Sequence, residues 1–230
     1  MRPATIGVVR FVLTGRAVPF ARPGVVSGIA KQVRHAPVRL AADGFDGDEQ
    51  GDRRVHGGPD KAAHVYAHEH YRDWIDELGP SAVLAVPGAF GENLSTSGLL
   101  ERDVCLGDEL RIGSAVVQVS QARQPCWKLN HRFGVSDMAR RVQERGRTGW
   151  YVRVLRAGEV SAGDAIELVA RPFPEWPLSR LLDALYRSSA EDSRAVLAAG
   201  LPLVPSWRRL FERRLESRRI EDWSARLGES

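Results

Sequence analysis

A proline-rich segment near residue 172 constrains the fold of this 230-residue chain more than any other feature of its sequence. Three of the seven positions in residues 171–177 are proline. Because proline fixes the backbone angle φ and has no amide hydrogen, neither a helix nor a central strand continues through such a segment. We therefore predict two domains, residues 1–171 and residues 178–230, joined by a linker at residues 172–177.

The first domain is predicted to consist mainly of β-strands. Short runs rich in β-branched residues, such as residues 115–120 and 150–155, are bounded by Gly, Pro and Asp. Residues 104–112 and 160–168 share one pattern, in which a Gly-Asp turn joins two strands. This organisation is typical of a small barrel or sandwich.

Two helices are expected among these strands. Tyr71, Trp74, Ile75 and Leu78 recur at the helical spacing, and the Gly-Pro pair that follows them is a stop signal for a helix. A second helix is predicted over residues 136–146, where a Ser-Asp pair provides an N-terminal cap.

The C-terminal domain is predicted to contain two or three short helices. Four leucines between residues 178 and 185 mark the first helix, and residues 189–192 have the form of a capping box that opens a second helix ending at Gly200. Ser206 is positioned to cap a third. A helical unit of roughly 55 residues is marginally stable alone, so we expect it to dock on the barrel or on a partner.

Composition limits the classes of function. No stretch approaches the length of about 18 apolar residues that a membrane span requires, so we expect a cytoplasmic protein without a membrane partner. The net charge of +4 permits nucleic-acid binding, but the arginines are scattered along the chain, and a nucleic-acid partner is not predicted. Two cysteines are too few for a disulfide scaffold or a four-cysteine zinc site.

Cys126 has the sequence environment that best indicates chemistry. It follows a predicted strand and comes directly after Pro125, which ends strand pairing and places the thiol on a loop. Arg123 and Lys128 flank it, and positive charge favours the thiolate that ligates metals or attacks electrophiles. The alternative is a buried cysteine that acts as a small apolar side chain. For Cys105, which alternates with apolar residues in a predicted strand, that structural interpretation is preferred.

Two histidines raise the question of a zinc site. His64 and His68 are one helical turn apart and Glu69 is adjacent, but their order does not match the His-Glu-x-x-His motif of zinc proteases. We interpret both as surface or boundary residues of the first helix and do not predict a zinc site.

Two glycine-containing loops, residues 56–62 and 90–96, can bring backbone amides close to a ligand, although ordinary turns have the same composition. The chain has only three lysines, Lys31, Lys61 and Lys128, and they lie in or beside segments of this kind or next to Cys126. Lysine is chosen over arginine where a compact, strongly hydrated cation is needed. Codon usage explains the same pattern equally well.

Taken in order, several of these segments resemble a known family. They are residues 45–50, 55–62, 69–71, 90–95, 119–129 and 149–150. Their residues and order are similar to those of MOSC-domain proteins of the YiiM type, and the helical tail is similar to the three-helix domain that accompanies this subgroup. The resemblance implies a mainly β fold, namely a MOSC-type β-barrel with peripheral helices followed by a small C-terminal helical domain.

The resemblance also implies a bound molybdenum cofactor, in which molybdopterin holds the metal and Cys126 is the protein ligand. A thiolate is a soft ligand suited to such a metal, and nearby cations can neutralise the pterin phosphate. By position, the residues expected to contact the cofactor are Lys31, His56, Asn93, Arg123 and Asn130.

The activity implied by the resemblance is the reduction of small N-hydroxylated compounds, including hydroxylamino purines, with two electrons from a redox partner. We expect that partner to be an electron-donating flavoprotein reductase that docks on basic residues such as Arg208, Arg213 and Arg214. The alternative is a module that carries the molybdenum cofactor or sulfur without turnover. The lack of a fused lyase domain favours the enzyme.

Overall fold

A closed β-barrel forms the centre of the computed structural model, which describes residues 3–52, 57–187 and 190–228. Within these residues seven strands run in the order β13-β9-β10-β11-β7-β8-β1, and pairing of β13 with β1 closes the barrel, while β4 extends the sheet beyond β1. The strands of this sheet are β1 (Ala4–Thr14), β4 (Gln32–Arg34), β7 (Ala63–Ala67), β8 (Leu94–Ser97), β9 (Glu109–Ile112), β10 (Ala115–Ala122), β11 (Trp150–Arg156) and β13 (Ala165–Ala170). The expected mainly β fold is confirmed.

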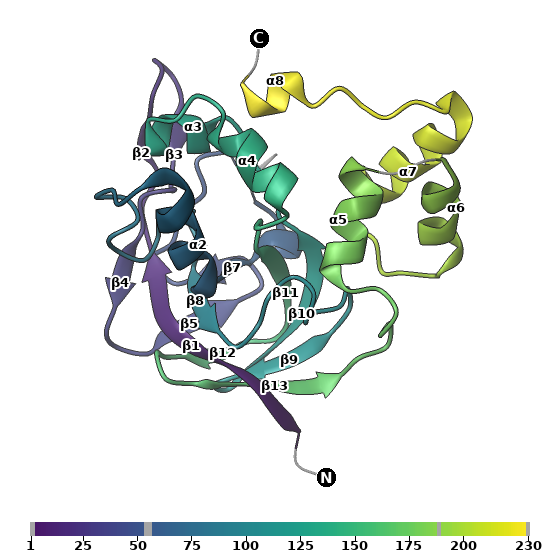
Figure 1. Ribbon diagram of the computed structural model, residues 1–230. Helices are drawn as coiled ribbons and strands as arrows, with labels where there is room; N and C mark the ends of the chain where they lie inside the picture. The colour runs from purple at the N-terminus through teal and green to yellow at the C-terminus, as the bar shows by residue number, and fades with distance from the viewer. Residues whose placement is uncertain (1–2, 53–56, 188–189, 229–230) are drawn as a thin grey trace.

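Smaller strands and helices surround the barrel (Figure 1). The smaller strands are β2 (Val18–Pro19), β3 (Val26–Ser27), β5 (Val38–Ala41), β6 (Gly44–Phe45) and β12 (Gly158–Val160). The helices are η1 (Pro59–Lys61), α2 (Glu69–Leu78), α3 (Lys128–Phe133), α4 (Met138–Arg145), α5 (Leu178–Tyr186), α6 (Ala190–Ala198), α7 (Pro205–Ser217) and α8 (Ser224–Leu227). Among the described residues, no helix is both long and apolar enough to cross a membrane.

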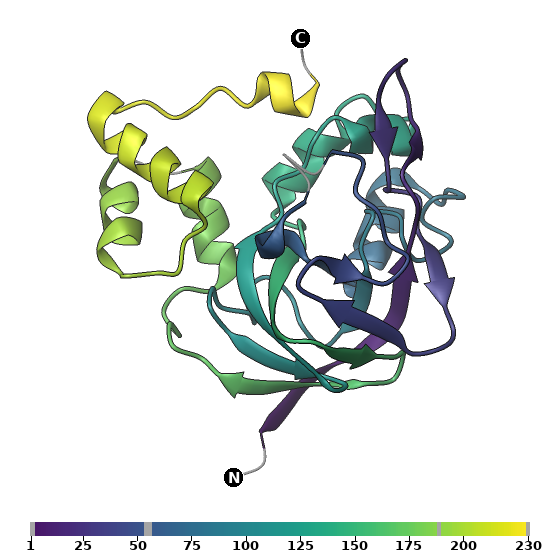
Figure 2. The same cartoon turned by 180° about the vertical axis from the view of Figure 1, so that it is seen from behind.

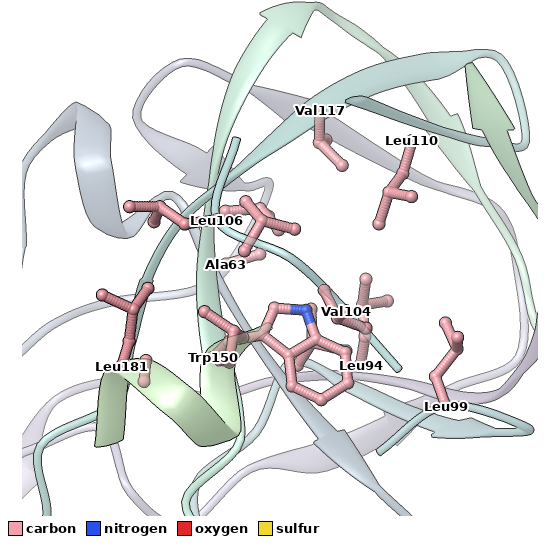
Figure 3. Packing of buried hydrophobic residues seen from close by; sticks show 14 of the residues in the cluster. Ala63, Leu94, Leu99, Val104, Leu106, Leu110, Val117, Trp150 and Leu181 are labelled. Atoms are coloured by element: carbon pink, nitrogen blue, oxygen red, sulfur yellow. The ribbon is translucent and has the colours of Figure 1, made fainter. Parts of the chain in front are cut away.

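One hydrophobic core unites the barrel with the C-terminal helices. Val117 of β10, Trp150 of β11 and Leu94 of β8 are fully or almost fully buried inside the barrel. Leu181 of α5 belongs to the same cluster, as Figure 3 shows. The helical tail therefore buries its apolar face against the barrel, which compensates for the small core that it can build alone.

The two Gly-Asp turns adopt the same geometry. Gly107 and Gly163 have φ angles of 83° and 91°, which a glycine adopts without strain. In each turn the Asp carboxylate accepts a hydrogen bond from the backbone amide three residues earlier. The Cys105 amide donates to Asp108 at 2.9 Å, and the Ser161 amide donates to Asp164 at 2.8 Å. The repeated pattern thus corresponds to one repeated turn.

The expectation that Cys105 lies inside a strand is wrong. Its backbone forms a single isolated bridge with Pro177, and its amide is bonded to the Asp108 carboxylate, so that amide is not available for a strand ladder. Its burial is as expected, since Cys105 is only 3% exposed.

Residues 172–177 are fixed to the barrel surface. The Trp176 carbonyl accepts the Leu106 amide at 3.1 Å, and the Leu178 amide donates to the Val104 carbonyl at 2.8 Å. The Trp176 side chain is itself buried in the core cluster. The prolines therefore end regular structure, as expected, while the segment that contains them packs tightly.

The predicted helices occur where the sequence places them, but some of their first residues differ from those expected. α2, α4 and α5 occur where periodicity predicts them. Ser206 does not cap α7, because this helix already begins at Pro205, and proline at a first helical position has the required φ angle. Ser189, the first residue of the predicted capping box, lies outside the described residues.

Arg214 links α7 to two other segments. Its guanidinium is 2% exposed and donates to the Ala184 and Leu185 carbonyls of α5 at 2.9 and 2.6 Å, and to the Glu221 carboxylate at 2.7 Å. The expectation that Arg214 contributes to a docking surface is therefore wrong, because its donors are used inside the protein. Arg208 and Arg213, on the same helix, are exposed.

We expect Arg214→Met to lower the free energy of unfolding by about 2–4 kcal/mol, because two buried carbonyls and a carboxylate lose their partner. The exposed neighbour provides the control, and Arg213→Met should change the free energy by less than about 0.5 kcal/mol. Urea denaturation followed by tryptophan fluorescence measures both. Equal effects of the two substitutions would contradict the structural role of Arg214.

Candidate functional site

The strand register brings several strand ends to one rim of the barrel. β10 ends at Ala122, opposite the first residue of β11, and the next residue of β11, Tyr151, pairs with His64 of β7. Asn93 directly precedes β8, which runs parallel to β7, and Arg123 directly follows β10. Side chains that are far apart in the sequence therefore meet at this rim.

A cavity with an empty volume of about 610 Å³ lies there. The residues that line it are Ser27, Gly28, Ile29, Lys31, Asp48, Glu49, Gln50, Gly51, Lys61, His64, Phe90, Gly91, Asn93, Arg123, Cys126, Lys128 and Tyr151. Among these described residues the cations Lys31, Lys61, Arg123 and Lys128 outnumber the carboxylates Asp48 and Glu49. The cavity therefore favours an anionic ligand.

Cys126 lies on the loop between β10 and α3, as the sequence predicts, and its side chain is partly exposed. Lys31, Asn93 and Arg123 line the same cavity. His56 lies outside the described residues. Four of the six expected site residues are thus brought together.

Asn130 is not brought to the cavity. Its side-chain amide donates to the Leu227 carbonyl at 2.7 Å and its oxygen accepts the Ala139 amide at 2.7 Å. These bonds join α3 to α4 and α8. The side chain of Asn130 therefore fixes the helices next to Cys126, and it does not line the cavity.

Arg123 has an unsatisfied donor. Its side chain is 6% exposed, and among the described residues its Nη1 has no hydrogen-bond partner. A buried guanidinium nitrogen without a partner costs free energy, and an anion bound in the cavity would provide the missing acceptor. The backbone of Arg123 is fixed by a 3.0 Å bond from its amide to the Gly149 carbonyl.

Lys31 is held by an ion pair. Its ammonium bonds to the Asp48 carboxylate, which also accepts the Gly15 amide at 2.9 Å. Burial lowers the pKa of Lys31, and the charge of Asp48 opposes that shift. The pair sets the position of one cation at the cavity.

Asn93 joins two strands at the cavity wall. Its oxygen accepts the His64 amide at 3.1 Å, and its nitrogen donates to the Leu13 carbonyl at 3.2 Å. Its polar atoms thereby hold β7 and β1 in position.

A buried carboxylate shapes the loop at residues 87–92. Glu92 is fully buried and accepts the amides of Gly88 at 2.9 Å and Phe90 at 3.1 Å, together with the Tyr71 hydroxyl. Burial, followed by the charge of Glu92, raises the pKa of Tyr71. Arg132 donates to the carbonyls of the same loop, so both the amides and the carbonyls of the turn are satisfied. This arrangement holds Phe90 at the cavity.

Two glycines of the cavity wall allow neighbouring backbone segments to pack closely. A Cβ atom on Gly28 would lie 2.0 Å from the Glu49 carbonyl oxygen, and one on Gly51 would lie 2.2 Å from the Val26 carbonyl oxygen. Because any larger side chain would push these segments apart, both positions require glycine.

Sequence reasoning missed several lining residues. It treated His64 as a surface or boundary residue of a helix, which is wrong, since His64 is 4% exposed in strand β7. Asp48 lies in residues 45–50, one of the segments that resemble the family, but no role was predicted for it. Tyr151 was predicted only to lie in a strand. The rarity of lysine and the glycine-containing loop at residues 56–62 both indicated Lys61.

The thiol of Cys126 does not form part of a conventional metal site. Within the described residues, no group of three or more His, Cys, Asp and Glu side chains is arranged to hold a metal ion. A single sulfur ligand among cations suits a metal that arrives with its own anionic chelating group.

Comparisons with known proteins agree with this fold. The MOSC domain matches residues 52–167, and the YiiM-like 3-alpha helix domain matches residues 176–218. The chain is 42% identical over 218 residues to Protein YiiM of Escherichia coli (strain K12), which covers 94% of this chain and 96% of that protein. The crystal structure of YiiM from Escherichia coli has a TM-score of 0.79 and 35% identity, and the match covers 99% of this chain and 98% of that chain.

A further relative carries a functional name. A protein of Gibberella moniliformis (strain M3125 / FGSC 7600) named Reductase is 36% identical over 213 residues, which are 92% of this chain but only 38% of that protein.

The burial of His64 predicts a pH dependence of stability. Burial, followed by the charge of Arg123, holds the pKa of His64 well below its ordinary value of 6.5. The unfolded chain therefore binds a proton below about pH 6.5 that the folded chain does not, so stability falls as the pH decreases, by up to about 1.4 kcal/mol per pH unit.

We expect His64→Gln to reduce the loss of unfolding free energy between pH 7 and pH 5, measured by urea denaturation at each pH. The exposed His35 provides the control, since His35→Gln should leave the loss as in the wild type. The same pH dependence in all three proteins would contradict the role of His64.

Proposed function

The chain belongs to the MOSC-domain family in its YiiM-like form, and from this we propose that it is an oxidoreductase that reduces N-hydroxylated compounds with a molybdenum cofactor. The observation that carries the proposal is the cavity, in which the Cys126 thiol lies among cations and beside the unsatisfied buried donor of Arg123. Similarity to a protein named Reductase supports the class of reaction.

The residues of the cavity fit this cofactor. Cys126 offers one soft ligand to a metal whose other ligands come from the pterin. Arg123 and Lys31 supply positive charge for the phosphate and sulfur groups, and the guanidinium of Arg123 suits two-point recognition of a phosphate. We therefore assign these three side chains to cofactor binding, with Asn93 acting through the backbone that it holds.

When bound, the cofactor supplies a two-electron reduction, in which an N–OH group, two electrons and two protons give an N–H group and water. The cleaved bond is N–O, and an electron-donating flavoprotein reductase is the proposed source of the electrons. The contribution of the protein is to place the substrate and to move protons.

Lys61 is the side chain best suited to move a proton. It lines the cavity, and its ammonium lies 5.7 Å from the centre of the Tyr151 ring. Burial, followed by the charge of Arg226, lowers the pKa of Lys61 below its ordinary value of 10.5. Its Nζ can therefore release a proton to the departing hydroxyl group more readily than an exposed lysine can.

The exposed arginines of α7 are the proposed docking residues for the flavoprotein. Arg208 and Arg213 are both exposed on this helix, and a cationic face of this kind increases the association rate with an acidic partner at low salt.

Molybdenum content tests the assignment of Cys126. We expect molybdenum in the wild type and in Cys105→Ala when both are purified from a molybdenum-replete host, and at least about a tenfold loss in Cys126→Ala. Elemental analysis by mass spectrometry provides the measurement. Absence of the metal from the wild type, or equal content in the two variants, would contradict the assignment.

Turnover separates an enzyme from a cofactor carrier. The wild type should convert a hydroxylamino purine to the amino purine in the presence of a chemical reductant. If the protein holds molybdenum but shows no turnover, it is a carrier and the proposed function is wrong.

The role of Lys61 as a proton donor is tested by two substitutions, one that removes the charge and one that keeps the charge but holds its proton more tightly. We expect Lys61→Met and Lys61→Arg both to lower kcat by about 100-fold, because arginine keeps the charge but does not release a proton at neutral pH. Molybdenum content, measured in parallel, should remain as in the wild type. Full activity of Lys61→Arg would show that charge alone is required.

A further inference from the structure

A second hollow leads outward from the cavity. Its empty volume is about 1130 Å³, and it shares Gly51, Cys126 and Lys128 with the cavity. The other lining residues are Gly24, Val25, Val26, Asp52, Trp127, Ala225 and Arg226. We call this hollow the outer groove. Because the shared residues include Cys126, a ligand whose reacting group lies beside the thiol has room to extend into the groove.

One wall of the outer groove comes from a distant part of the chain. After α7 the backbone crosses to the barrel and forms α8 next to α3, as Figures 1 and 2 both show. The Arg226 carbonyl accepts the Trp127 amide at 2.8 Å, which fixes α8 to the residue that follows Cys126. Leu227 is buried in the core cluster that contains α3 and α4. The backbone of Arg226 is therefore held in one place.

The side chain of Arg226 is partly exposed and faces this groove. Burial lowers the pKa of Lys61 and raises the pKa of Tyr151, two residues that line the inner cavity; the charge of Arg226 adds to the first shift and opposes the second. The guanidinium therefore lies close enough to act on groups beside Cys126. The guanidinium carbon also lies 5.9 Å from the centre of the Trp223 ring, and among the described residues the side chain has no hydrogen bond to a backbone carbonyl or a carboxylate.

Lys128 provides a second cation where cavity and groove meet. Its ammonium donates to the Val26 carbonyl at 3.0 Å, so the side chain bridges α3 and the β2–β3 hairpin. The side chain is 8% exposed, which restricts it to this position. Two further donor hydrogens of the ammonium remain for a ligand.

We propose that the outer groove binds the phosphate of a nucleotide substrate, with Arg226 and Lys128 as the phosphate contacts. The inference rests on the proposed function, since it places the N-hydroxylated base of that nucleotide beside Cys126. A guanidinium and an ammonium on two walls of one groove match a phosphate, because the guanidinium binds two oxygens and the ammonium binds a third. The physiological substrate is then a nucleotide, and free bases and nucleosides are poorer substrates.

Binding without turnover gives the first test. The probes are adenosine 5′-monophosphate and adenosine, titrated into the purified full chain by calorimetry at low salt. We expect the nucleotide to bind about tenfold more tightly than the nucleoside, and we expect this preference to disappear in Arg226→Gln. Arg219→Gln, an exposed arginine of the same C-terminal segment, is the control and should keep the preference. Equal affinity of the wild type for both probes would overturn the proposal.

Steady-state kinetics give the second test. With hydroxylamino substrates, the ratio of the KM for the nucleoside to the KM for the nucleotide should fall about tenfold in Arg226→Gln and recover partly in Arg226→Lys. Molybdenum content should match the wild type in both variants. A loss of molybdenum from Arg226→Gln would assign this residue to the cofactor phosphate instead, and would overturn the proposal.

The two proposals fail in different ways. If no hydroxylamino compound is reduced but the Arg226-dependent preference for the nucleotide persists, the reductase proposal fails and the phosphate site stands. If reduction occurs with equal efficiency on nucleoside and nucleotide, the reductase proposal stands and the phosphate site fails.

Discussion

Closure of the barrel depends on strand β1. Its first residues pair with β13, its middle residues with β8, and its last residues with β4. The register is irregular between Thr5 and Gly7, within the pairing with β13, and between Val9 and Phe11, within the pairing with β8, and such irregularities bend a strand. Gly7 is needed at the first turn, because a Cβ there would lie 2.8 Å from the Ser97 carbonyl oxygen. His64, Asn93 and Arg123 lie at the ends of neighbouring strands of this sheet, and the sheet that β1 closes carries them at one rim.

The sequence predicts features that depend on neighbours along the chain. The strands around residues 115–120 and 150–155, the periodic helix before Gly79 and the loop position of Cys126 follow from local composition, and all occur in the structure. Features that depend on distant partners were not predicted. Arg214 looks like any surface arginine until α5 supplies two carbonyls and the segment after α7 supplies Glu221.

The same distinction applies to the site. Arg123 and Cys126 are close in sequence, so flanking charge could be recognised, and they line one cavity. The burial of His64 depends on pairing with β11, and the position of Arg226 depends on α8 packing next to Trp127. Asn130 resembled a ligand contact because it follows Cys126 closely, but the two helices that it joins become neighbours only in the fold. Proximity in sequence therefore indicated that Cys126 and Arg123 lie together, but not which distant residues surround them.

The attachment of α8 to α3 also affects how the protein is made. Asn130 and its partner Leu227 are separated by 97 positions, so the support for the Cys126 loop emerges from the ribosome well after the loop itself. At ordinary rates of synthesis this delay is about 5–20 s. Once β13 has been made, at residue 170, all the barrel strands exist while the thiol remains without one wall of its surroundings. Access to the groove beside Cys126 is widest in this open intermediate, and the later arrival of α8 narrows it.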